Sequence, residues 1–384
     1  MWYDIGDLLG AQRARLNDLC VQEPCVVRRN TPDAYVCYGG GMHILITGGA
    51  GFIGANLTAN LLQDGYRVSI YDNLSRPGVA HNLHWLRTRF GDARVVLRKG
   101  DIRDAAQTQA ALADADIIIH LAGQVAVTTS VANPREDFDI NALGTFNVLE
   151  AARLSGRNPI VLYSSTNKVY GGMEDIVVVE DNTRWRYRDL PRGVTEVQPL
   201  DFHSPYGCSK GTGDQYVRDY HRIYDLRTVV FRQSAIYGPR QFGVEDQGWA
   251  AHFIIATQLK RKMSIFGDGK QVRDLLYIDD LVAAYRSAIE RIDHVAGEIF
   301  NIGGGPDNTI SIWREFRPHL DTLNGAPVAD PTFADWRPGD QRVCVLNVDK
   351  AQTALNWRPT VDVTRGIEQL WHWVADSRAE IESR

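Results

Sequence analysis

The stretch Thr47-Gly48-Gly49-Ala50-Gly51-Phe52-Ile53-Gly54 follows the apolar run His43-Ile44-Leu45-Ile46 and precedes a segment of helical period. A glycine-rich turn between a strand and a helix is the layout of a dinucleotide-binding site, because main-chain N–H groups at a helix start can approach a pyrophosphate. Glycine at 48 permits a tight turn, glycine at 51 leaves room for phosphate, and glycine at 54 allows close helix packing. Glycine runs also occur in plain loops, so the surrounding sequence must decide.

Apolar, β-branched runs alternate with longer segments of helical period along most of the chain. The runs lie at 43–47, 67–71, 94–98, 116–121, 159–164 and 226–232. Strands that alternate with helices form βαβ units, and these units build a parallel sheet with helices on both faces. We therefore expect a doubly wound α/β fold of the Rossmann type. Beyond residue 236 the alternation weakens, and helical stretches near 247–261, 310–322 and 363–377 predict a smaller C-terminal lobe.

The chain is expected to have three parts. Residues 1–41 form an N-terminal extension, which ends in Tyr38-Gly39-Gly40-Gly41 before Met42, the expected natural start. The alternative is an arm that packs on the body of the protein. Residues 42–235 form the dinucleotide-binding domain, and residues 236–384 form a substrate-binding lobe that is partly interleaved with it.

Composition excludes several classes of function. The 384 residues carry a net charge of −5 and no basic tract, which argues against nucleic acid or an anionic membrane as the main partner. We find no apolar run of about 18 residues, so no membrane span is expected, and cytoplasm is the default location. The five cysteines form no C-x-x-C pair and the histidines show no ligand spacing, so neither a disulfide framework nor a metal site is expected.

An acidic residue follows the second expected strand. Asp72 lies 24 residues after Gly48, at the end of Val68-Ser69-Ile70-Tyr71-Asp72. A carboxylate there can accept hydrogen bonds from the two hydroxyls of a ribose and repels a 2′-phosphate, which favours NAD over NADP. Arg76 weakens this preference slightly, and a strand-terminal Asp is often only a turn residue.

A tyrosine and a lysine have the spacing of a proton-transfer pair. Tyr206 and Lys210 lie four residues apart, so a helix places both on one face. A free phenol has a pKa of about 10, and a nearby ammonium group favours the phenolate, which can then accept a proton from a hydroxyl group. The pair alone is common by chance, but Thr166, after the fifth expected strand, adds a hydroxyl that can hold the reacting oxygen.

The chain resembles the extended short-chain dehydrogenase/reductases over residues 43–375. The resemblance rests on the glycine turn, on Tyr163-Ser164-Ser165-Thr166-Asn167-Lys168-Val169-Tyr170-Gly171 and on Ser204-Pro205-Tyr206-Gly207-Cys208-Ser209-Lys210. It implies catalytic roles for Thr166, Tyr206 and Lys210. It implies cofactor contacts for Gly48, Gly51, Phe52, Ile53, Gly54, Asp72, Asn73, Ser75, Arg76, Asp101, Ile102, Leu121, Ala122, Gly123, Gln124, Asn141, Ser164, Tyr206, Lys210 and Gln233. It implies nucleotide-sugar contacts for Thr128, Asn167, His203, Arg240, Gln247, Arg273 and Arg342.

Two departures from the family pattern narrow the expected reaction. Asn167 and Lys168 stand at the positions where nucleotide-sugar 4,6-dehydratases have an acidic pair that eliminates water. The resemblance to this family therefore disfavours dehydration. Ala235 stands near the place where many 4-epimerases carry an asparagine that contacts phosphate, which makes a galactose-type 4-epimerase less favoured. The longest similar strings, among them Asp201–Gly211, match the branch that epimerises CDP-linked sugars at C2.

We therefore expect NAD-dependent epimerisation at C2 of a CDP-hexose or a CDP-3,6-dideoxyhexose through a transient keto sugar. Three alternatives stay open: another nucleotide-sugar 4-epimerase, a dehydrogenase of the same family, and an NAD-binding regulatory protein on the same fold. The resemblance also implies a homodimer or homotetramer.

Overall fold

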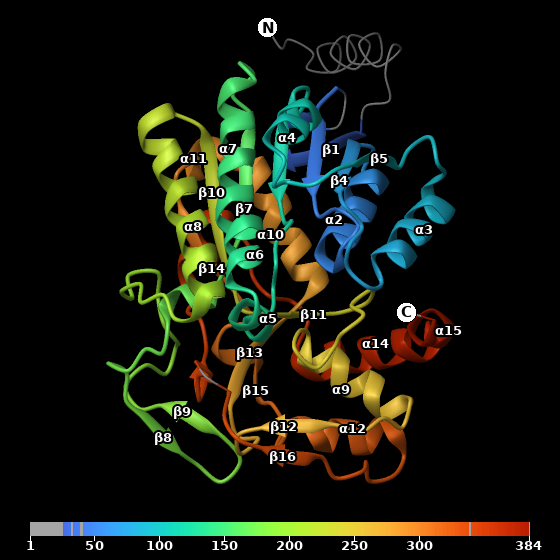
Figure 1. Ribbon diagram of the computed structural model, residues 1–384, viewed down its shortest axis with the longest axis vertical. Helices are drawn as coiled ribbons and strands as arrows, with labels where there is room; N and C mark the ends of the chain where they lie inside the picture. The colour runs from blue at the N-terminus through green and yellow to red at the C-terminus, as the bar shows by residue number, and fades with distance from the viewer. Residues whose placement is uncertain (1–25, 32–33, 39–40, 338, 384) are drawn as a thin grey trace, which may run out of the picture.

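A seven-stranded parallel sheet forms the centre of the larger lobe in this computed structural model, which describes residues 26–31, 34–38, 41–337 and 339–383 (Figure 1). The strand order is β5-β4-β3-β6-β7-β10-β14, and each neighbouring pair is parallel. The strands are β3 (His43–Thr47), β4 (Arg67–Asp72), β5 (Val96–Lys99), β6 (Ile117–His120), β7 (Ile160–Thr166), β10 (Arg227–Gln233) and β14 (Ile299–Ile302). The doubly wound α/β fold is confirmed, with β14 as an additional edge strand that the sequence pattern did not predict.

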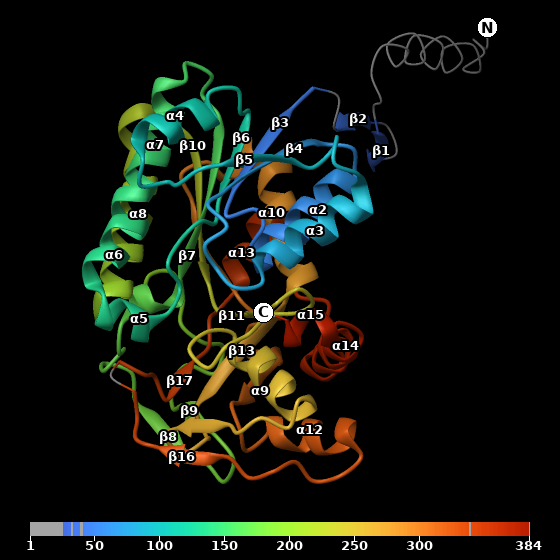
Figure 2. The ribbon, with the colours of Figure 1, turned by 45° about the vertical axis from the view of Figure 1, so that its right-hand side comes forward.

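Helices cover both faces of the sheet because successive strand residues point to opposite sides. Ile44 and Ile46 of β3 join one buried cluster, whereas Leu45 between them joins another. The first cluster includes side chains of α2 (Phe52–Gln63), α3 (Val79–Phe90) and α10 (Ile278–Glu290). The second includes side chains of α4 (Ala105–Leu112), α7 (Gly144–Leu154) and α8 (Ser204–Tyr224), and Figure 2 shows the two groups on either side of the strands.

A run of short helices connects β6 to α7. It consists of α5 (Val127–Ala132), α6 (Pro134–Phe138) and the π-helix η1 (Asp139–Leu143). Asn133 caps α6 by accepting the N–H of Glu136, and Pro134 occupies the first helical position, where its missing N–H costs nothing. All three elements pack on α8, so this connection lies directly behind the helix that carries Tyr206 and Lys210.

The smaller lobe is built around a four-stranded sheet. Its strands are β11 (Ala235–Tyr237), β13 (Val272–Tyr277), β15 (Thr309–Ser311) and β17 (Val343–Cys344), and the flanking pairs are β12 (Ser264–Phe266) with β16 (Thr332–Ala334) and β8 (Val178–Glu180) with β9 (Trp185–Tyr187). Its helices are α9 (Trp249–Gln258), α12 (Phe316–Asn324), α14 (Val363–Asp376) and α15 (Arg378–Glu382). The helix expected near 310–322 was placed too early, because Thr309–Ser311 pairs antiparallel with β13 and the helix begins at Phe316.

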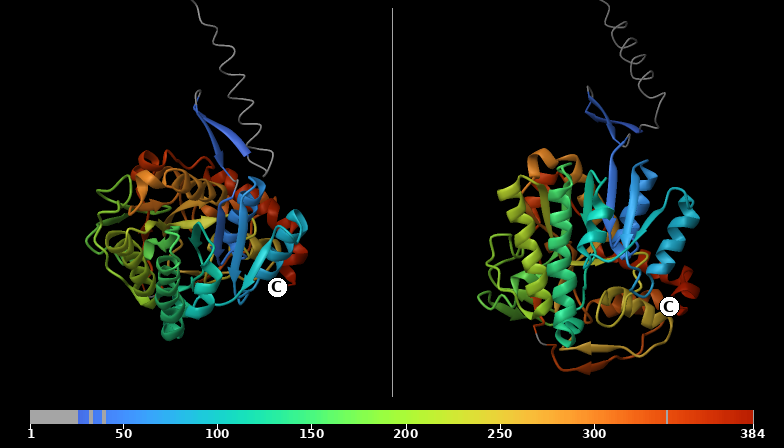
Figure 3. Two further views of the ribbon diagram at one scale, coloured as in Figure 1. Left: turned by 90° about the horizontal axis from the view of Figure 1, so that it is seen from above. Right: turned by 45° about the horizontal axis from the view of Figure 1, so that its top comes forward.

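Several elements from the C-terminal part of the chain return to the larger lobe. Besides β14 and α10, they include α11 (Ile292–Val295) and α13 (Asp349–Leu355), while η2 (Asn167–Tyr170) and η3 (Pro306–Asn308) are single turns. The division of the chain at residue 235 stays a prediction. The antiparallel hairpin β1 (Val26–Thr31) and β2 (Ala34–Tyr38) stands beside the body (Figure 3), and residues 1–25, 32–33 and 39–40 of the expected N-terminal extension lie outside the described residues. Within the described ranges, no helix has both the length and the apolar character needed to cross a membrane.

Candidate active site

The glycine turn has the geometry that a pyrophosphate requires. Gly48 has φ 67° and its N–H donates to the carbonyl of Tyr71 at 2.8 Å, so the turn is bound to the neighbouring strand. A Cβ on Gly54 would lie 2.2 Å from the carbonyl oxygen of Gly48, which shows how closely the start of α2 approaches the turn. A Cβ at Gly51 would meet only the oxygen of Gly48 at 3.2 Å, so the side facing the cavity is open. The residues present therefore fit a dinucleotide.

A cavity of about 380 Å³ lies against this turn, at the carboxyl ends of the strands. Ligands in open α/β sheets bind at that edge, outside the strand ends. The structure brings most of the predicted cofactor residues together here. They are Gly48, Gly51, Phe52, Ile53, Gly54, Asp72, Asn73, Ser75, Arg76, Asp101, Ile102, Leu121, Ala122, Gly123, Gln124 and Ser164.

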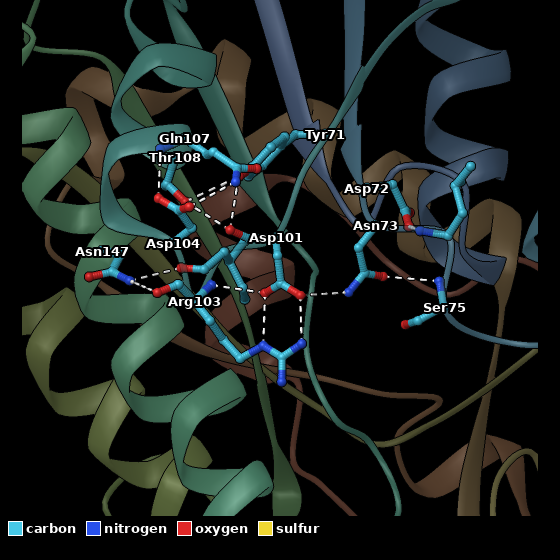
Figure 4. A network of polar contacts seen from close by, with 12 residues as sticks. Tyr71, Asp72, Asn73, Ser75, Asp101, Arg103, Asp104, Gln107, Thr108 and Asn147 are labelled. Atoms are coloured by element: carbon cyan, nitrogen blue, oxygen red, sulfur yellow. Dashed lines mark hydrogen bonds and ion pairs between the residues drawn. The ribbon is translucent and has the colours of Figure 1, made fainter.

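The acidic side of this cavity is held by a network of hydrogen bonds (Figure 4). Asp72 accepts the N–H groups of Leu74 at 2.8 Å and Ala50 at 3.2 Å, which fixes its carboxylate, and burial raises its pKa. Asn73 donates to Asp101 at 3.0 Å, and Arg103 binds the same carboxylate through two donors. The hydrogen bonds from Arg103 lower the pKa of Asp101, so this rim stays ionised.

The loop after β6 closes the opposite side of the cavity. The hydroxyl of Thr47 accepts the N–H groups of Leu121 at 3.2 Å and Ala122 at 3.1 Å. Asn141 accepts the N–H of Gln124 at 2.9 Å and donates to its carbonyl at 3.1 Å. Asn141, predicted as a cofactor contact, does not line the cavity in the structure and instead positions the loop that does.

A second cavity of about 210 Å³ adjoins the first. The two share the side chains or backbone of Phe52, Ile53, Leu121, Gly123, Val125, Ser164 and Gln247. The second cavity is lined by Thr166, Tyr206, Lys210 and Gln233, so the predicted catalytic residues meet next to the first cavity. Gln233 is fixed by a 2.8 Å hydrogen bond to the hydroxyl of Tyr285.

Burial dominates the electrostatics of the catalytic pair. Burial raises the pKa of Tyr206 to about 12, while a hydrogen bond from Thr166 and the charge of Arg76 lower it. Burial lowers the pKa of Lys210 to about 7, and the carboxylates of Asp214 and Asp137 oppose that effect. The ammonium of Lys210 lies 4.3 Å from the centre of the Tyr163 ring and donates to the carbonyl of Ser164. Unless a further positive charge lies beside it, the phenol of Tyr206 therefore holds its proton at neutral pH.

Four of the predicted substrate residues gather around residues 339–344, beside η2 rather than in either cavity. Asn167 donates to the sulfur of Cys344 at 3.0 Å, and His203 lies against Gly339. Arg273 pairs with Asp340 at 2.7 Å. The guanidinium carbon of Arg342 stacks 4.5 Å from the Trp185 ring centroid and 5.8 Å from that of Trp336, and it forms no salt bridge with a described residue. Arg342 therefore has free donors for an anion.

The other three predicted substrate residues have different places. Gln247 lines both cavities and accepts a 3.1 Å hydrogen bond from Arg76, so it joins the two lobes across the site. The Thr128 hydroxyl is buried next to Thr129 of the first cavity, and it has no hydrogen-bond partner within the described part of the chain. Arg240 is not among the residues that line either cavity: it is buried, donates to Asn82 and Glu380, and stacks on Trp85.

Sequence reasoning missed part of the wall of the second cavity. Tyr237 ends β11, Trp249 begins α9, and Gln241 lies in the loop between them. Gln241 is buried, and its side-chain oxygen has no hydrogen-bond partner among the described residues. In the sequence this wall is a Gly- and Pro-rich segment with a Gln and a Trp after a strand. These residue types have no known spacing that would have identified a binding site. The first cavity likewise includes Thr129 and Glu136 from the helices after β6.

A tyrosine, a lysine and a threonine beside a dinucleotide cavity define an enzyme that oxidises or reduces an alcohol carbon with a bound dinucleotide. The chain belongs to the NAD dependent epimerase/dehydratase family, which it matches over residues 44–303. It is an extended short-chain dehydrogenase/reductase, and its cofactor is NAD.

Relatives within this family act on different nucleotide sugars. The chain is 43% identical over 343 residues to a CDP-paratose 2-epimerase of Salmonella typhi, covering 87% of this chain and 99% of the relative. It is similar in structure to DesIV (dTDP-glucose 4,6-dehydratase) of Streptomyces venezuelae, solved with NAD, at a TM-score of 0.74, 29% identity, and coverage of 88% and 98%. It is also similar to a UDP-glucuronic acid 4-epimerase of Bacillus cereus, solved with UDP-glucuronic acid and NAD, at a TM-score of 0.73, 28% identity, and coverage of 87% and 99%. The chain is thus a nucleotide-sugar epimerase or dehydratase of the extended family.

Proposed function

We propose that the protein epimerises C2 of a CDP-linked hexose or 3,6-dideoxyhexose through a transient 2-keto sugar. The observation that carries this proposal is the second cavity, whose described lining brings the phenol of Tyr206, the amine of Lys210 and the hydroxyl of Thr166 together. The similarity to a CDP-paratose 2-epimerase supports the choice of the CDP group and of C2.

Each residue has a defined part in this reaction. The phenolate of Tyr206 takes the proton of the C2 hydroxyl, and the phenol returns it to the same oxygen later. The ammonium of Lys210 stabilises the phenolate, and the Thr166 hydroxyl holds the reacting oxygen. Bound NAD supplies a reversible acceptor for the C2 hydride. Arg342 and Arg273 hold the diphosphate while the sugar presents its other face. Arg273 then divides its donors between the diphosphate and Asp340.

The composition of the cavity argues against dehydration. Elimination of water requires an acid and a base at a second carbon, besides the pair that acts on the alcohol. No Asp, Glu or His is among the described residues that line the second cavity. Asn167 and Lys168 occupy the turn where an acidic pair would be required, and Lys168 is turned toward Gln341 at 3.2 Å.

The alternatives are a nucleotide-sugar 4-epimerase and a dehydrogenase, which need the same three residues. They are separated by incubating the protein with CDP-, UDP-, GDP- and dTDP-sugars and following C2 and C4 by NMR. We expect inversion at C2 of a CDP-sugar, no net NADH, and retention of a deuterium label at C2. Inversion at C4, net NADH, or loss of the label to solvent would each overturn the proposal.

We also propose that the protein is a cytoplasmic homodimer or homotetramer. The supporting observation is a row of exposed apolar side chains on the outer face of α7 and α8, among them Phe146, Tyr216 and Ile223. Large exposed apolar patches on folded proteins mark interaction surfaces.

A further inference from the structure

A buried carboxylate lies behind the catalytic helix. Asp137, at the end of α6, is 1% exposed, although neighbouring Arg135 and Glu136 are exposed. Ionised carboxylates are rarely buried unless a charge or several hydrogen bonds compensate them. No Lys, Arg or His of the described chain forms a salt bridge with it, so its place in the fold requires another explanation.

The carboxylate is bound to the helix segment between the two catalytic side chains. Ser209 donates to Asp137 Oδ2 at 2.5 Å, and Asn141 donates to Asp137 Oδ1 at 3.1 Å. Asn141 Nδ2 also lies 3.2 Å from the Ser209 hydroxyl and 3.1 Å from the carbonyl of Gln124. The same small network therefore joins α6, α8 and the loop that lines the first cavity.

The charged and titratable groups around Lys210 show why the carboxylate of Asp137 matters for its ammonium. The neighbouring carboxylate of Asp214 is fully buried and is bound by Arg232 through two hydrogen bonds of 2.9 Å, so its charge is largely neutralised. The other groups that face Lys210 are His120, which is neutral in its buried site, the ring of Tyr163, and the Tyr206 phenol. Asp137 is the carboxylate among these groups that has no cation of its own.

We propose that Asp137 is a positioning residue that fixes the turn between Tyr206 and Lys210 through Ser209 and adds, beside Asp214, a negative charge that favours the protonated form of the buried Lys210. The inference rests on the proposed role of Lys210 beside Tyr206. Its consequence is that loss of the carboxylate leaves the buried ammonium with only the charge of Asp214, which Arg232 already binds, so that Lys210 releases its proton at lower pH.

The direct measurement is the titration of Lys210 itself. The chain contains seven lysines, so protein labelled with [13Cε]lysine gives few signals, and Lys210→Arg identifies the one of interest. In the wild-type protein we expect a midpoint near 7, where burial places the pKa of Lys210. In Asp137→Asn we expect a midpoint lower by about one pH unit. The NAD content of each preparation is measured after acid release, so that variants are compared at equal content.

A matched control and a second variant keep the experiment decisive. Asp139→Asn removes a carboxylate two residues away that pairs with Arg135 at the surface, and it should leave the Lys210 midpoint unchanged. Burial raises the pKa of Asp137 and the hydrogen bond from Ser209 opposes that effect, so Ser209→Ala makes the Asp137 carboxyl take up a proton more readily. This variant should therefore move the Lys210 midpoint in the same direction as Asp137→Asn. An unchanged midpoint in whichever of these two variants folds would overturn the inference.

The titration needs no substrate, so the two proposals fail separately. If the shift is seen but CDP-sugars are not epimerised, the proposed function fails and the role of Asp137 stands. If CDP-sugars are epimerised and the midpoint does not move, Asp137 is only structural. With an active protein, the alkaline limb of the kcat profile of Asp137→Asn should move to lower pH by the same amount as the NMR midpoint.

Discussion

The main-chain N–H of Tyr206 donates a 3.1 Å hydrogen bond to the side-chain oxygen of Ser130, a residue 76 positions earlier in the chain. Tyr206 lies in the first turn of α8, where main-chain N–H groups have no partner within the helix. The Ser204 hydroxyl accepts the N–H of Gly207 at 3.2 Å, so two side chains share the capping of this helix. Ser130 is fully buried, and its hydrogen bond connects α5 to the turn that carries the phenol of Tyr206.

Replacing Ser130 with alanine should therefore loosen the start of α8. Loss of a capping oxygen costs about 1 kcal/mol of stability, and the buried N–H of Tyr206 is left without a partner. We expect Ser130→Ala to lower the melting temperature and to reduce kcat more than it raises KM. Thr212→Ala is the control, because Thr212 only donates to the carbonyl of Cys208 on the same helix. A variant with wild-type stability and kcat would show that Ser204 alone caps the helix.

The hydroxyl of Tyr206 is expected to be indispensable. Tyr206→Phe keeps the ring that fills the cavity and removes the group that transfers the proton, so we expect turnover to fall by roughly 10²–10⁴-fold. The melting temperature and the NAD content should stay close to wild-type values. Tyr224→Phe, at an exposed position of the same helix, should leave activity unchanged. Substantial turnover by Tyr206→Phe would remove the phenol as the base.

Local sequence was sufficient to predict the tight glycine turn and the centre of the fold. The turn at Gly48 and the alternation of Ile44, Leu45 and Ile46 are local patterns, and the structure places them as expected. The roles of Ser130 and Asp137 depend on contacts 72 or more residues apart, which no spacing records. The edge strand β14, which pairs with β10, was also not predicted from the sequence pattern.

Two arginines predicted to contact substrate should behave differently. Arg240 is buried between Glu380 and the Trp85 ring, so Arg240→Ala should lower the free energy of unfolding by about 1–3 kcal/mol without changing KM at permissive temperature. Arg342 is exposed and forms no salt bridge with a described residue, so Arg342→Ala should raise KM for the nucleotide sugar about tenfold or more with little loss of stability. Urea unfolding and steady-state kinetics on both variants measure these effects. A raised KM in Arg240→Ala would place that residue in the substrate site after all.

A buried histidine should make the fold sensitive to acid. The Thr47 oxygen already accepts two N–H groups, so the Thr47 hydroxyl donates to Nδ1 of His120 at 2.7 Å. The N–H at Nε2 of His120 then donates to the Thr145 hydroxyl at 3.0 Å. Burial, with the charge of Lys210 added, lowers the pKa of His120 from 6.5 to about 3. Below pH 6.5 the unfolded chain binds a proton that the folded protein does not.

The contribution of His120 to stability is therefore complete above pH 6.5 and is lost as the pH falls toward 3, by up to about 1.4 kcal/mol per unit. We expect the difference in free energy of unfolding between wild type and His120→Gln to shrink from pH 7 to pH 5 in urea titrations. His84→Gln, at an exposed position, should leave that dependence unchanged. A difference that is constant with pH would mean that His120 does not titrate between the two states in this range.

The outer face of α7 and α8 should join a second copy of the chain. Phe146 on α7 and Tyr216 on α8 meet edge to face with ring centroids 6.0 Å apart, yet they are 39% and 46% exposed, and Ile223 is 63% exposed. A glutamate on this face would be buried without a cation when two copies of the chain associate. Phe146→Glu combined with Ile223→Glu should therefore convert the oligomer to a monomer in sedimentation velocity. Val197→Glu introduces the same charge at a residue that is 89% exposed and lies outside these helices, and it should leave the oligomer intact. A monomeric wild-type protein, or an oligomer that survives the double substitution, would contradict this assignment.

Because α8 also carries Tyr206 and Lys210, the monomer should lose activity in proportion to any loss of order in that helix, which hydrogen exchange of its amides can measure.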